Sequence, residues 1–374
     1  MTFVLRFLVH MAVFFLSVVR WVLVLGTLGT GFAAHAQDLP WHLGSLNASG
    51  ASAPSSLNTA GVKPGPHPVV VAVIDSGVLA NHPSLSGRLL PGYDMLSAPH
   101  NVRGGRSADF APDMRDARCG ERVGTGPFRT HGTEVASLIA GNGHEGVVGV
   151  NPSAKIVPIR LFGSCNMGRV DLLDALSWAA GLPVTGVPTN PNPARVINLS
   201  FSGGKPICGV DLQQVLDRIA KKNIFVVAAV GNTFGKKLAE PANCDGVISV
   251  GAVDSENNIA NYSALDARTV IYAPGGGQRL AGDAPWRVNK LKVGTYDLDF
   301  KGDETPAASF RGVGTSYAAP LVSGFVSLLL SHRANMTPAE FFQQLPQFSR
   351  PVNPSTVCPE CIPRGLAMRS MSQN

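Results

Sequence analysis

The sequence contains few charged residues: Asp, Glu, Lys and Arg make up 15% of its 374 residues, whereas hydrophobic residues make up 45%. A disordered chain shows the opposite balance, so this composition excludes one. The 41 glycines and 28 prolines follow no period, which excludes a collagen-like chain. An internal repeat of roughly 20–50 residues, as in a solenoid or propeller, is also lacking. These absences leave a globular protein with a large core, long enough for one large domain or two ordinary ones.

Long basic runs are absent too, although the formal net charge is +6. No run of Lys and Arg exceeds two residues, so a solvated, mildly basic surface is a better interpretation than a nucleic-acid interface. We therefore expect no nucleic-acid partner, and nothing in the composition points to a particular oligomeric state.

The N-terminal segment has the pattern of an export signal. The apolar stretch Trp21–Phe32 follows Arg20, and Ala34–Ala36 places small residues where signal peptidases select them, before Gln37. We predict that residues 1–36 are a signal peptide and that the protein is secreted or periplasmic. A retained membrane anchor is the alternative, although the apolar stretch is short for a full span. Contact with a membrane is expected only through this segment.

The cysteines agree with export, because an even number of them in an exported chain suggests disulfides. Two form a Cys-x-x-Cys motif in a proline-rich tail, without the second ligand pair of a zinc site and away from the helix start of a thioredoxin-type site. A structural bridge is the better interpretation of this motif. The six cysteines are Cys119, Cys165, Cys208, Cys244, Cys358 and Cys361.

Residues 37–67 predict an N-terminal arm or linker, because most of them are Gly, Ser, Asn, Ala and Pro. Residues 68–374 then predict a single domain in which apolar runs alternate with helical segments. The runs are nearly continuous, as in strands buried on both faces of a parallel sheet. They are residues 69–74, 155–162, 195–201, 224–230, 246–253 and 269–273.

Amphipathic segments lie between these runs. Residues 170–182 and 210–223 each place apolar side chains on one face, and Thr337–Glu340 has the pattern of a capping box with proline at the first helical position. The alternation predicts an α/β domain with a central, mainly parallel sheet flanked by helices. In such sheets active sites lie beyond the carboxyl ends of the strands, so the residues that follow each strand are the candidates.

Asp75 and His131 are the first two candidates. Asp75 follows the first apolar run, where a carboxylate is costly unless it has a partner; a turn or helix cap is the alternative. His131 begins the helical sequence HGTEVASLIAG, and a lone histidine at such a place is more often a surface or capping residue.

Asn232 and Ser316 are the other two candidates. Asn232 lies in a Gly-Asn pair after the run 224–230; such a pair is usually a turn, but its amide also suits a developing oxyanion. Ser316 lies in the sequence GVGTSYAAP at the start of a strongly apolar helix, where a serine is by default an N-cap.

Taken together, the four residues have a more specific interpretation. A serine hydroxyl needs a neighbouring base to act as a nucleophile, and the base needs a carboxylate that orients it. Ser316, His131 and Asp75 supply these roles. The tetrahedral intermediate needs hydrogen-bond donors, which the Asn232 amide and the Ser316 N–H at a helix start supply.

The same segments carry a resemblance to a known family. They are VAVIDSGV (71–78), HGTEVASLIAG (131–141), VINLSFSGG (196–204), VVAAVGN (226–232) and GTSYAAP (314–320), in order within residues 68–345. With Asp, His and Ser in this order, the chain resembles the subtilisin-like serine proteases, the subtilase family. The resemblance implies a three-layer subtilisin-like fold, with residues 68–374 as a peptidase domain.

The resemblance also implies further roles. Ser200, Phe201 and Ser202 are expected to form the edge that pairs with an extended substrate, and Gly231 to line the pocket for the residue before the scissile bond. By likeness to the secreted, disulfide-bonded bacterial branch, the implied disulfides are Cys119–Cys165, Cys208–Cys244 and Cys358–Cys361.

The sequence departs from the family pattern at several positions. Glu134 stands where many members have a second histidine, and Tyr317 where others have methionine; neither change removes a catalytic group. Some members have the aspartate of a calcium site where this chain has Ser84. Because such sites depend on carboxylates, we expect no metal and no cofactor, with calcium as the alternative. Residues 37–74 leave no room for the usual inhibitory prodomain. The insert Gln278–Arg311 predicts an exposed hairpin or flap that tunes substrate access.

The predicted function is therefore an exported serine endopeptidase that hydrolyses peptide bonds of proteins or peptides through an acyl-enzyme intermediate. A catalytically silent module that binds extended peptides in the same groove is the alternative; the complete set of Asp75, His131 and Ser316 argues against it. An esterase of the α/β-hydrolase type requires the order Ser, acid, His, which this chain does not have.

Overall fold

The structure is a computed structural model, and it describes residues 43, 63–98, 101, 103–112, 130–162, 167–277, 291–294, 309–353 and 364–366. These residues belong to one compact unit, Leu39–Asn374. The predicted signal peptide and most of the predicted arm lie outside the described residues. None of the helices in the described part of the chain combines the length and the hydropathy of a membrane span.

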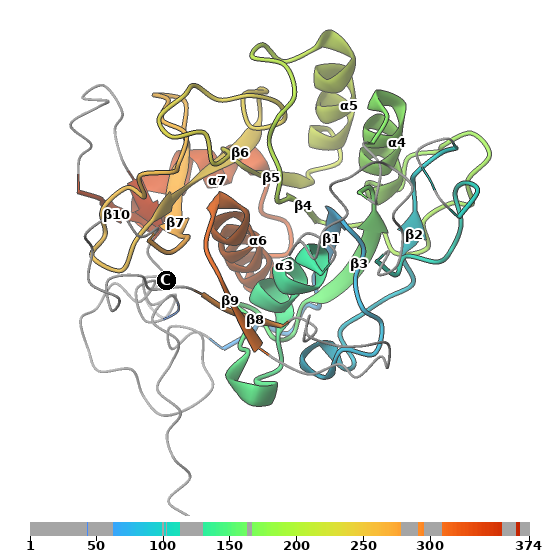
Figure 1. Cartoon of the computed structure of the whole chain (residues 1–374), viewed down its shortest axis with the longest axis horizontal. Helices are drawn as coiled ribbons and strands as arrows, with labels where there is room; N and C mark the ends of the chain where they lie inside the picture. Colours follow the sequence, from blue (N-terminus) through green and yellow to red (C-terminus); the bar gives the residue numbers. More distant parts are fainter. Residues whose placement is uncertain are drawn as a thin grey trace, which may run out of the picture. The chain divides into compact units, whose positions relative to one another are not determined.

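A nine-stranded sheet runs through this unit (Figure 1). Its order is β10-β11-β7-β6-β5-β4-β1-β3-β2, and neighbouring strands pair in parallel except β10, which is antiparallel to β11. The strands are β1 (Val70–Asp75), β2 (Tyr93–Asp94), β3 (Lys155–Arg160), β4 (Val196–Leu199), β5 (Phe225–Ala229), β6 (Val247–Val253), β7 (Ile271–Pro274), β10 (Ser349–Pro351) and β11 (Arg364–Leu366).

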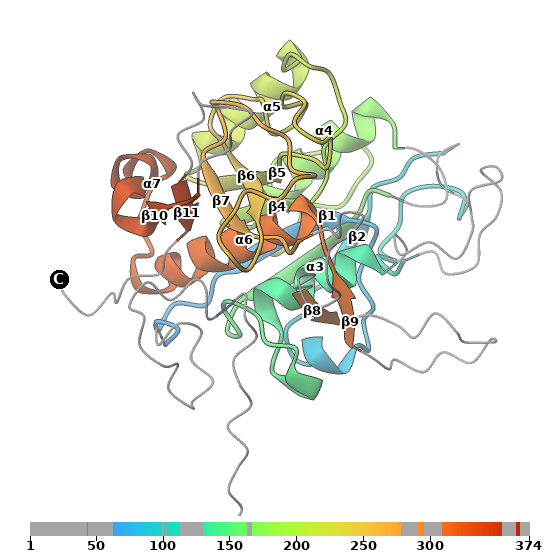
Figure 2. The ribbon, with the colours of Figure 1, turned by 60° about the vertical axis from the view of Figure 1, so that its left-hand side comes forward.

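Helices cover both faces of the sheet. The described α-helices are α3 (His131–Ala140), α4 (Arg169–Ala179), α5 (Val210–Ala220), α6 (Thr315–His332) and α7 (Pro338–Gln344). Short 3-10 helices are η2 (Pro83–Leu85), η3 (His144–Gly146) and η5 (Leu345–Phe348). Figure 2 shows α4 and α5 together on one side of the sheet and α3 and α6 together on the other.

Alternate residues of each strand face opposite helical layers. In β1, Val71 and Val73 belong to the core beneath α3 and α6, whereas Ala72 and Ile74 belong to the core beneath α4 and α5. All four are fully buried, which explains why the strand sequences are continuous apolar runs. The predicted three-layer α/β fold with a mainly parallel sheet is confirmed.

The predicted elements differ from the observed ones mainly at their ends. Each of the six predicted strands is present, with ends that move by no more than two residues. The two amphipathic helices end earlier than predicted, because Gly181 and Asn223 adopt left-handed backbone angles, with φ of 68° and 55°. The capping box of α7 is present: the Thr337 hydroxyl accepts the Glu340 N–H, and the Glu340 carboxylate accepts the Thr337 N–H.

The order of the strands places a crevice next to β1. After β1 the chain forms β2 and β3 on one side, then returns to β4 on the other side and continues outward to β7. Ligands of such sheets bind outside the carboxyl ends of the strands where this reversal occurs. Asp75, the last residue of β1, therefore lies at the predicted position of an active site, as does Ser200, which follows β4.

The insert Gln278–Arg311 contributes to a second, two-stranded sheet. β8 (Leu291–Gly294) and β9 (Ser309–Gly312) pair antiparallel, and β8 lies against α3. This pair agrees with the hairpin that the sequence predicts. The residues that connect β8 to β9 lie outside the described residues, so the predicted flap stays a prediction.

A disulfide joins Cys208 to Cys244, which is one of the pairs that the resemblance implies. It links the segment after β4 to the segment between β5 and β6. Both segments follow strands whose carboxyl ends carry predicted site residues. The other four cysteines, Cys119, Cys165, Cys358 and Cys361, lie outside the described residues, and their pairing stays a prediction.

Replacing Cys208 and Cys244 together by alanine should lower the free energy of unfolding by about 4 kcal/mol, because the disulfide restricts the unfolded chain over a separation of 36 residues. Urea unfolding followed by fluorescence measures the change. The parent protein and the variant without the disulfide both carry Ser316→Ala, so that the predicted peptidase activity cannot degrade the unfolded state. A loss below about 1 kcal/mol would contradict the expectation.

Candidate active site

Asp75 and His131 meet at the carboxyl end of β1. The Asp75 side chain is 1% exposed, and that of His131, the first residue of α3, is 14% exposed. Nδ1 of His131 lies 2.8 Å from Oδ1 and 3.0 Å from Oδ2 of Asp75. The carboxylate thus accepts the Nδ1–H hydrogen bond, which makes Nε2 the basic nitrogen of the neutral imidazole.

Neighbouring residues hold the start of α3 against the end of β1. The Gly132 N–H donates to Ser76 Oγ (3.0 Å), and the Leu79 N–H donates to Thr133 Oγ1 (3.1 Å). A Cβ on Gly132 would lie 2.3 Å from the carbonyl oxygen of Gly77, so this close approach requires glycine. The His-Gly pair at the start of α3 therefore follows from the packing that brings His131 to the strand end.

Two carboxylates raise the pKa of His131. Burial acts to lower this pKa, but the charge of Asp75, its hydrogen bond and the charge of Glu134 outweigh burial and raise the pKa from 6.5 to about 9. The site therefore favours the protonated imidazole, and so it stabilises the charge that His131 gains when it accepts a proton.

Ser316 lies inside the first turn of α6. Gly314 is the N-cap and the helix begins at Thr315, so Ser316 is not the capping residue of the alternative interpretation. Its N–H belongs to the turn for which a helix offers no acceptor. α6 packs against α3, and the Tyr317 ring centroid lies 5.8 Å from that of His131. The first turns of the two helices, which carry Ser316 and His131, are thus neighbours.

Asn232 follows β5 and faces the start of α6. Its Oδ1 accepts hydrogen bonds from the N–H and from the hydroxyl of Thr315, both at 3.0 Å. These bonds set the orientation of the amide, so that Nδ2 is its donor end; Nδ2 lies 3.2 Å from the position that a Cβ on Gly314 would occupy. A negative charge that develops beside the first turn of α6 would meet this donor.

Ser200 binds the backbone of the same helical turn. Its hydroxyl donates to the carbonyl oxygen of Ser316 (2.8 Å) and accepts from Asn198 Nδ2 (2.9 Å). Oδ1 of Asn198 in turn accepts from the hydroxyl of Ser323, further along α6 (2.8 Å). This buried polar chain attaches α6 to β4.

The other predicted substrate residues lie next to this turn. A Cβ on Gly231 would lie 3.1 Å from Ser202 Oγ, and the Gly231 N–H donates to Thr315 Oγ1 (3.2 Å). Phe201 turns its ring edge-on to that of Phe162, with centroids 4.8 Å apart. The predicted edge and the predicted pocket residue are therefore brought together beside α6.

The structure joins two residues near the site, Glu134 and Tyr317, whose contact the sequence does not reveal. Tyr317 donates a hydrogen bond to Glu134, whose carboxylate also accepts one from Thr130. The available signal is that each residue departs from the family pattern close to a predicted catalytic residue. Sequence reasoning treats each of them as a separate, harmless departure.

Glu240 is another residue that sequence reasoning misses. Its buried carboxylate accepts hydrogen bonds from the Gly209 N–H (2.6 Å), the Lys205 N–H (3.3 Å) and the Arg169 guanidinium (2.7 Å). Burial acts to raise the pKa of Glu240, but these donors lower it below the usual range. Glu240 thereby holds the loop that follows Ser202. Its position in a polar segment gives no signal of this role.

Among the residues that the structure describes, no group of three or more His, Cys, Asp or Glu side chains is placed to hold a metal ion. Ser84, which the resemblance places where some family members have a calcium-binding aspartate, is fully buried. Its hydroxyl lies 2.8 Å from Nδ1 of His82.

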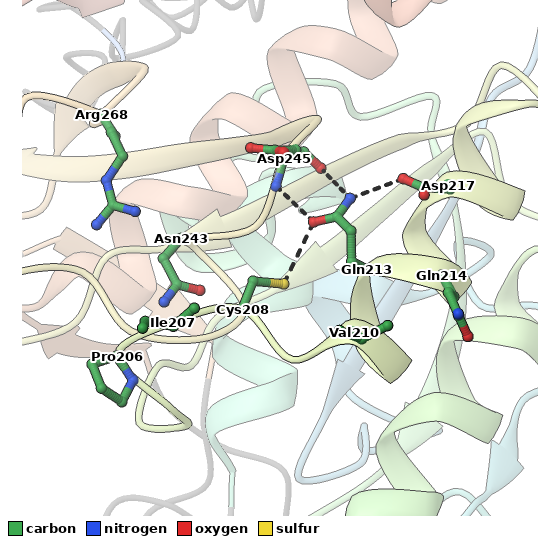
Figure 3. A pocket seen from close by; sticks show the side chains of 10 residues that line it. All are labelled: Pro206, Ile207, Cys208, Val210, Gln213, Gln214, Asp217, Asn243, Asp245 and Arg268. Carbon is green, nitrogen blue, oxygen red and sulfur yellow. Dashed lines mark hydrogen bonds between the residues drawn. The ribbon is translucent and has the colours of Figure 1, made fainter.

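A surface pocket of about 440 Å³ lies beside the N-terminal half of α5 (Figure 3). Its lining includes Cys208 but neither Asp75 nor His131, so this pocket is not the candidate active site. The lining residues are Pro206, Ile207, Cys208, Val210, Gln213, Gln214, Asp217, Asn243, Asp245 and Arg268.

Residues 67–349 match the profile of a family described as the subtilase family. Two curated relatives, each 36% identical, are named "Extracellular basic protease" (Dichelobacter nodosus, 277 aligned residues) and "Extracellular protease" (Xanthomonas campestris pv. campestris, 272 aligned residues). Each alignment covers 70% of this chain, but 43% and 44% of the relatives, so the chain spans less than half of their length.

A solved structure gives a similar result. This structure, of proteases from Pseudoalteromonas arctica, is 31% identical to this chain with a TM-score of 0.67. The match covers 88% of this chain and 91% of that chain. The likeness therefore extends over most of both chains.

Replacing Asp75 by asparagine should lower the pKa of His131 from about 9 by about one to three pH units, because the charged partner disappears while burial remains. NMR titration of the His131 ring measures this pKa. The parent and the variant both carry Ser316→Ala, which prevents self-digestion. A parent pKa near 6.5 would contradict the expectation.

The same interaction should link stability to pH. Because the folded-state pKa of His131 exceeds its ordinary value of 6.5, its contribution to the free energy of unfolding is fully present below pH 6.5 and is lost as the pH rises through about 9. The Asp75→Asn variant should show a flatter profile over this range. Urea unfolding of both chains at several pH values tests this.

Proposed function

Because the chain belongs to the subtilase family, we propose that it is an exported serine endopeptidase that hydrolyses peptide bonds of protein or peptide substrates. The observation that carries this proposal is the 2.8 Å bond between Asp75 and Nδ1 of His131, at a helix start that packs beside α6 and Ser316. A carboxylate in this position orients an imidazole and stabilises its charged form. The names of the two relatives support the same reaction.

In the proposed mechanism, Nε2 of His131 takes the proton of the Ser316 hydroxyl while Oγ attacks the substrate carbonyl carbon. Asp75 holds Nδ1–H and stabilises the imidazolium that forms. The Asn232 amide and the Ser316 N–H bind the oxyanion of the tetrahedral intermediate. His131 then protonates the leaving amine, and it activates the water that hydrolyses the acyl-enzyme.

The proposed substrate is an extended segment of polypeptide. β4 ends at Leu199, so the backbone of residues 200–202 leaves the sheet and offers groups for pairing with an added strand. The hydrogen bond from Ser200 to the Ser316 carbonyl (2.8 Å) supports a position of this edge beside the proposed nucleophile. Gly231, which faces Ser202, lines the pocket for the residue before the scissile bond.

Export supports the same proposal. Residues 1–36 have the pattern of a signal peptide, and the Cys208–Cys244 disulfide suits an oxidising compartment. The two curated relatives are named extracellular proteases. We therefore place the action of residues 68–374 in the periplasm or outside the cell.

A fluorophosphonate should label the exported, folded protein once, on Ser316, because this reagent reacts with a serine that a neighbouring base activates. Intact mass and peptide mapping locate the adduct. The Ser316→Ala variant is the control and should stay unlabelled. A folded, oxidised protein that gains no adduct but binds an extended peptide would be the catalytically silent module instead.

Replacing Asn232 by alanine should lower kcat by about 10²–10³-fold with a small change in KM, because the amide binds the oxyanion and not the ground-state carbonyl. Steady-state hydrolysis of a peptide p-nitroanilide measures both constants. Thr315→Val removes one of the two bonds that orient the amide but keeps Nδ2, so it should lose much less. Equal losses in the two variants would argue against the donor role.

A further inference from the structure

A hydrogen-bonded network of buried hydroxyl and carboxylate groups runs beside the proposed catalytic residues. Oε1 of Glu134 accepts a hydrogen bond from the Thr130 hydroxyl (2.8 Å), and Oε2 accepts one from the Tyr317 hydroxyl (2.5 Å). Thr130 directly precedes His131, and Tyr317 directly follows Ser316. The network therefore joins the sequence neighbours of His131 and Ser316, the two residues that are proposed to exchange a proton.

All three side chains of this network are shielded from solvent. Thr130 is 0%, Glu134 1% and Tyr317 6% exposed. A carboxylate at such depth is costly unless its oxygens are hydrogen-bonded, and here each oxygen has a hydroxyl donor. Burial raises the pKa of Tyr317, so its hydroxyl keeps the proton that it donates. Loss of either donor would leave a buried carboxylate oxygen without that partner.

Backbone contacts restrain both ends of this hydrogen-bonded network. The Glu134 N–H donates to the carbonyl oxygen of Thr130 (3.0 Å), which keeps the carboxylate within the first turn of α3. At the other end, a Cβ on Gly312 would lie 2.3 Å from Cζ of Tyr317. The end of β9 therefore passes directly against the tyrosine ring, and the absence of a side chain on Gly312 makes room for it.

We propose that Thr130, Glu134 and Tyr317 form a positioning clamp that sets the imidazole of His131 relative to the hydroxyl of Ser316. The clamp is a direct side-chain connection between the first turns of α3 and α6. Its members are positioning residues, because they act through their neighbours and not on the substrate. The inference rests on the proposed function, since its effect is on the reaction of Ser316.

The physical basis is the sensitivity of proton transfer to distance. A misplacement of about 1 Å between reacting groups costs about 10²-fold in rate. Other bonds hold each helix start to the end of a strand, whereas the clamp joins the two starts to each other through a buried, hydrogen-bonded carboxylate. The clamp thus controls the separation on which the proposed reaction depends.

A double-mutant cycle tests the clamp. Glu134→Leu and Tyr317→Phe should each lower kcat by about 10–100-fold with little change in KM, because the proposed substrate groups lie elsewhere. The kcat of the double variant should be little lower than that of the worse single variant, since both changes disrupt the same hydrogen-bonded network. Glu134→Gln, which can still bind both hydroxyls, should keep most of the activity.

Ser327→Ala is the matched control. Ser327 is buried further along α6, where its hydroxyl accepts a hydrogen bond from Asn151 Nδ2 (3.0 Å). This variant also loses a buried side-chain bond of α6, so its thermal stability should fall about as much as that of Tyr317→Phe, while kcat stays unchanged. Losses of kcat that are additive in the cycle, or equal in the control, would overturn the clamp.

A second readout needs no turnover. The proton between His131 Nδ1 and Asp75 gives a separate NMR signal, which should shift in Tyr317→Phe and stay in place in Ser327→Ala. An unchanged signal in Tyr317→Phe would refute the clamp. If the parent protein fails to react with the fluorophosphonate but the NMR signal still shifts in Tyr317→Phe, the proposed function is refuted and the clamp stands.

Discussion

The buried contact between the Asp75 carboxylate and the His131 imidazole is the constraint on which the rest of the site depends. Asp75 closes a strand whose neighbours are apolar, and a carboxylate there costs free energy unless a partner reaches it. The partner comes from the first residue of α3, so the helix must start directly on the strand end. Gly132 and Ser76 serve this requirement, the first by leaving room and the second by accepting a backbone N–H.

α6 is held at its start by polar bonds and along its length by apolar packing. It contacts β4, β5, β6 and β7, and all its residues except Ser316 and His332 are buried. In its first turn Thr315 bonds to Asn232, the Ser316 carbonyl accepts from Ser200, and Tyr317 donates to Glu134. These partners come from the segments after β5 and β4 and from α3. The elements that carry the other predicted site residues therefore also fix the turn that contains Ser316.

The sequence allows prediction of features that have a local cause. Strands buried on both faces must be continuous apolar runs, so the six central strands could be located, and motif residues could be assigned to their ends. β2 and β11 could not, because strands of two or three residues show no period and pair only with strands already in place. The Glu134–Tyr317 bond could not be predicted either, because its partners are 183 positions apart and each looks conservative alone. The same holds for Glu240, whose donors become apparent only when the loop is folded.

Two carboxylates act on one imidazole, and their surroundings give them different tasks. The charges of Asp75 and Glu134 both raise the pKa of His131, but only Asp75 bonds to the ring. Burial raises the pKa of Glu134, against the opposing effects of the His131 charge and of the two hydroxyl bonds. A protonated Glu134 can still bind both hydroxyls, because a carboxylic acid keeps one donor and its remaining acceptor capacity. The carboxylate that bonds to the imidazole thus controls its charge, whereas the carboxylate that bonds to hydroxyls controls the geometry in either protonation state.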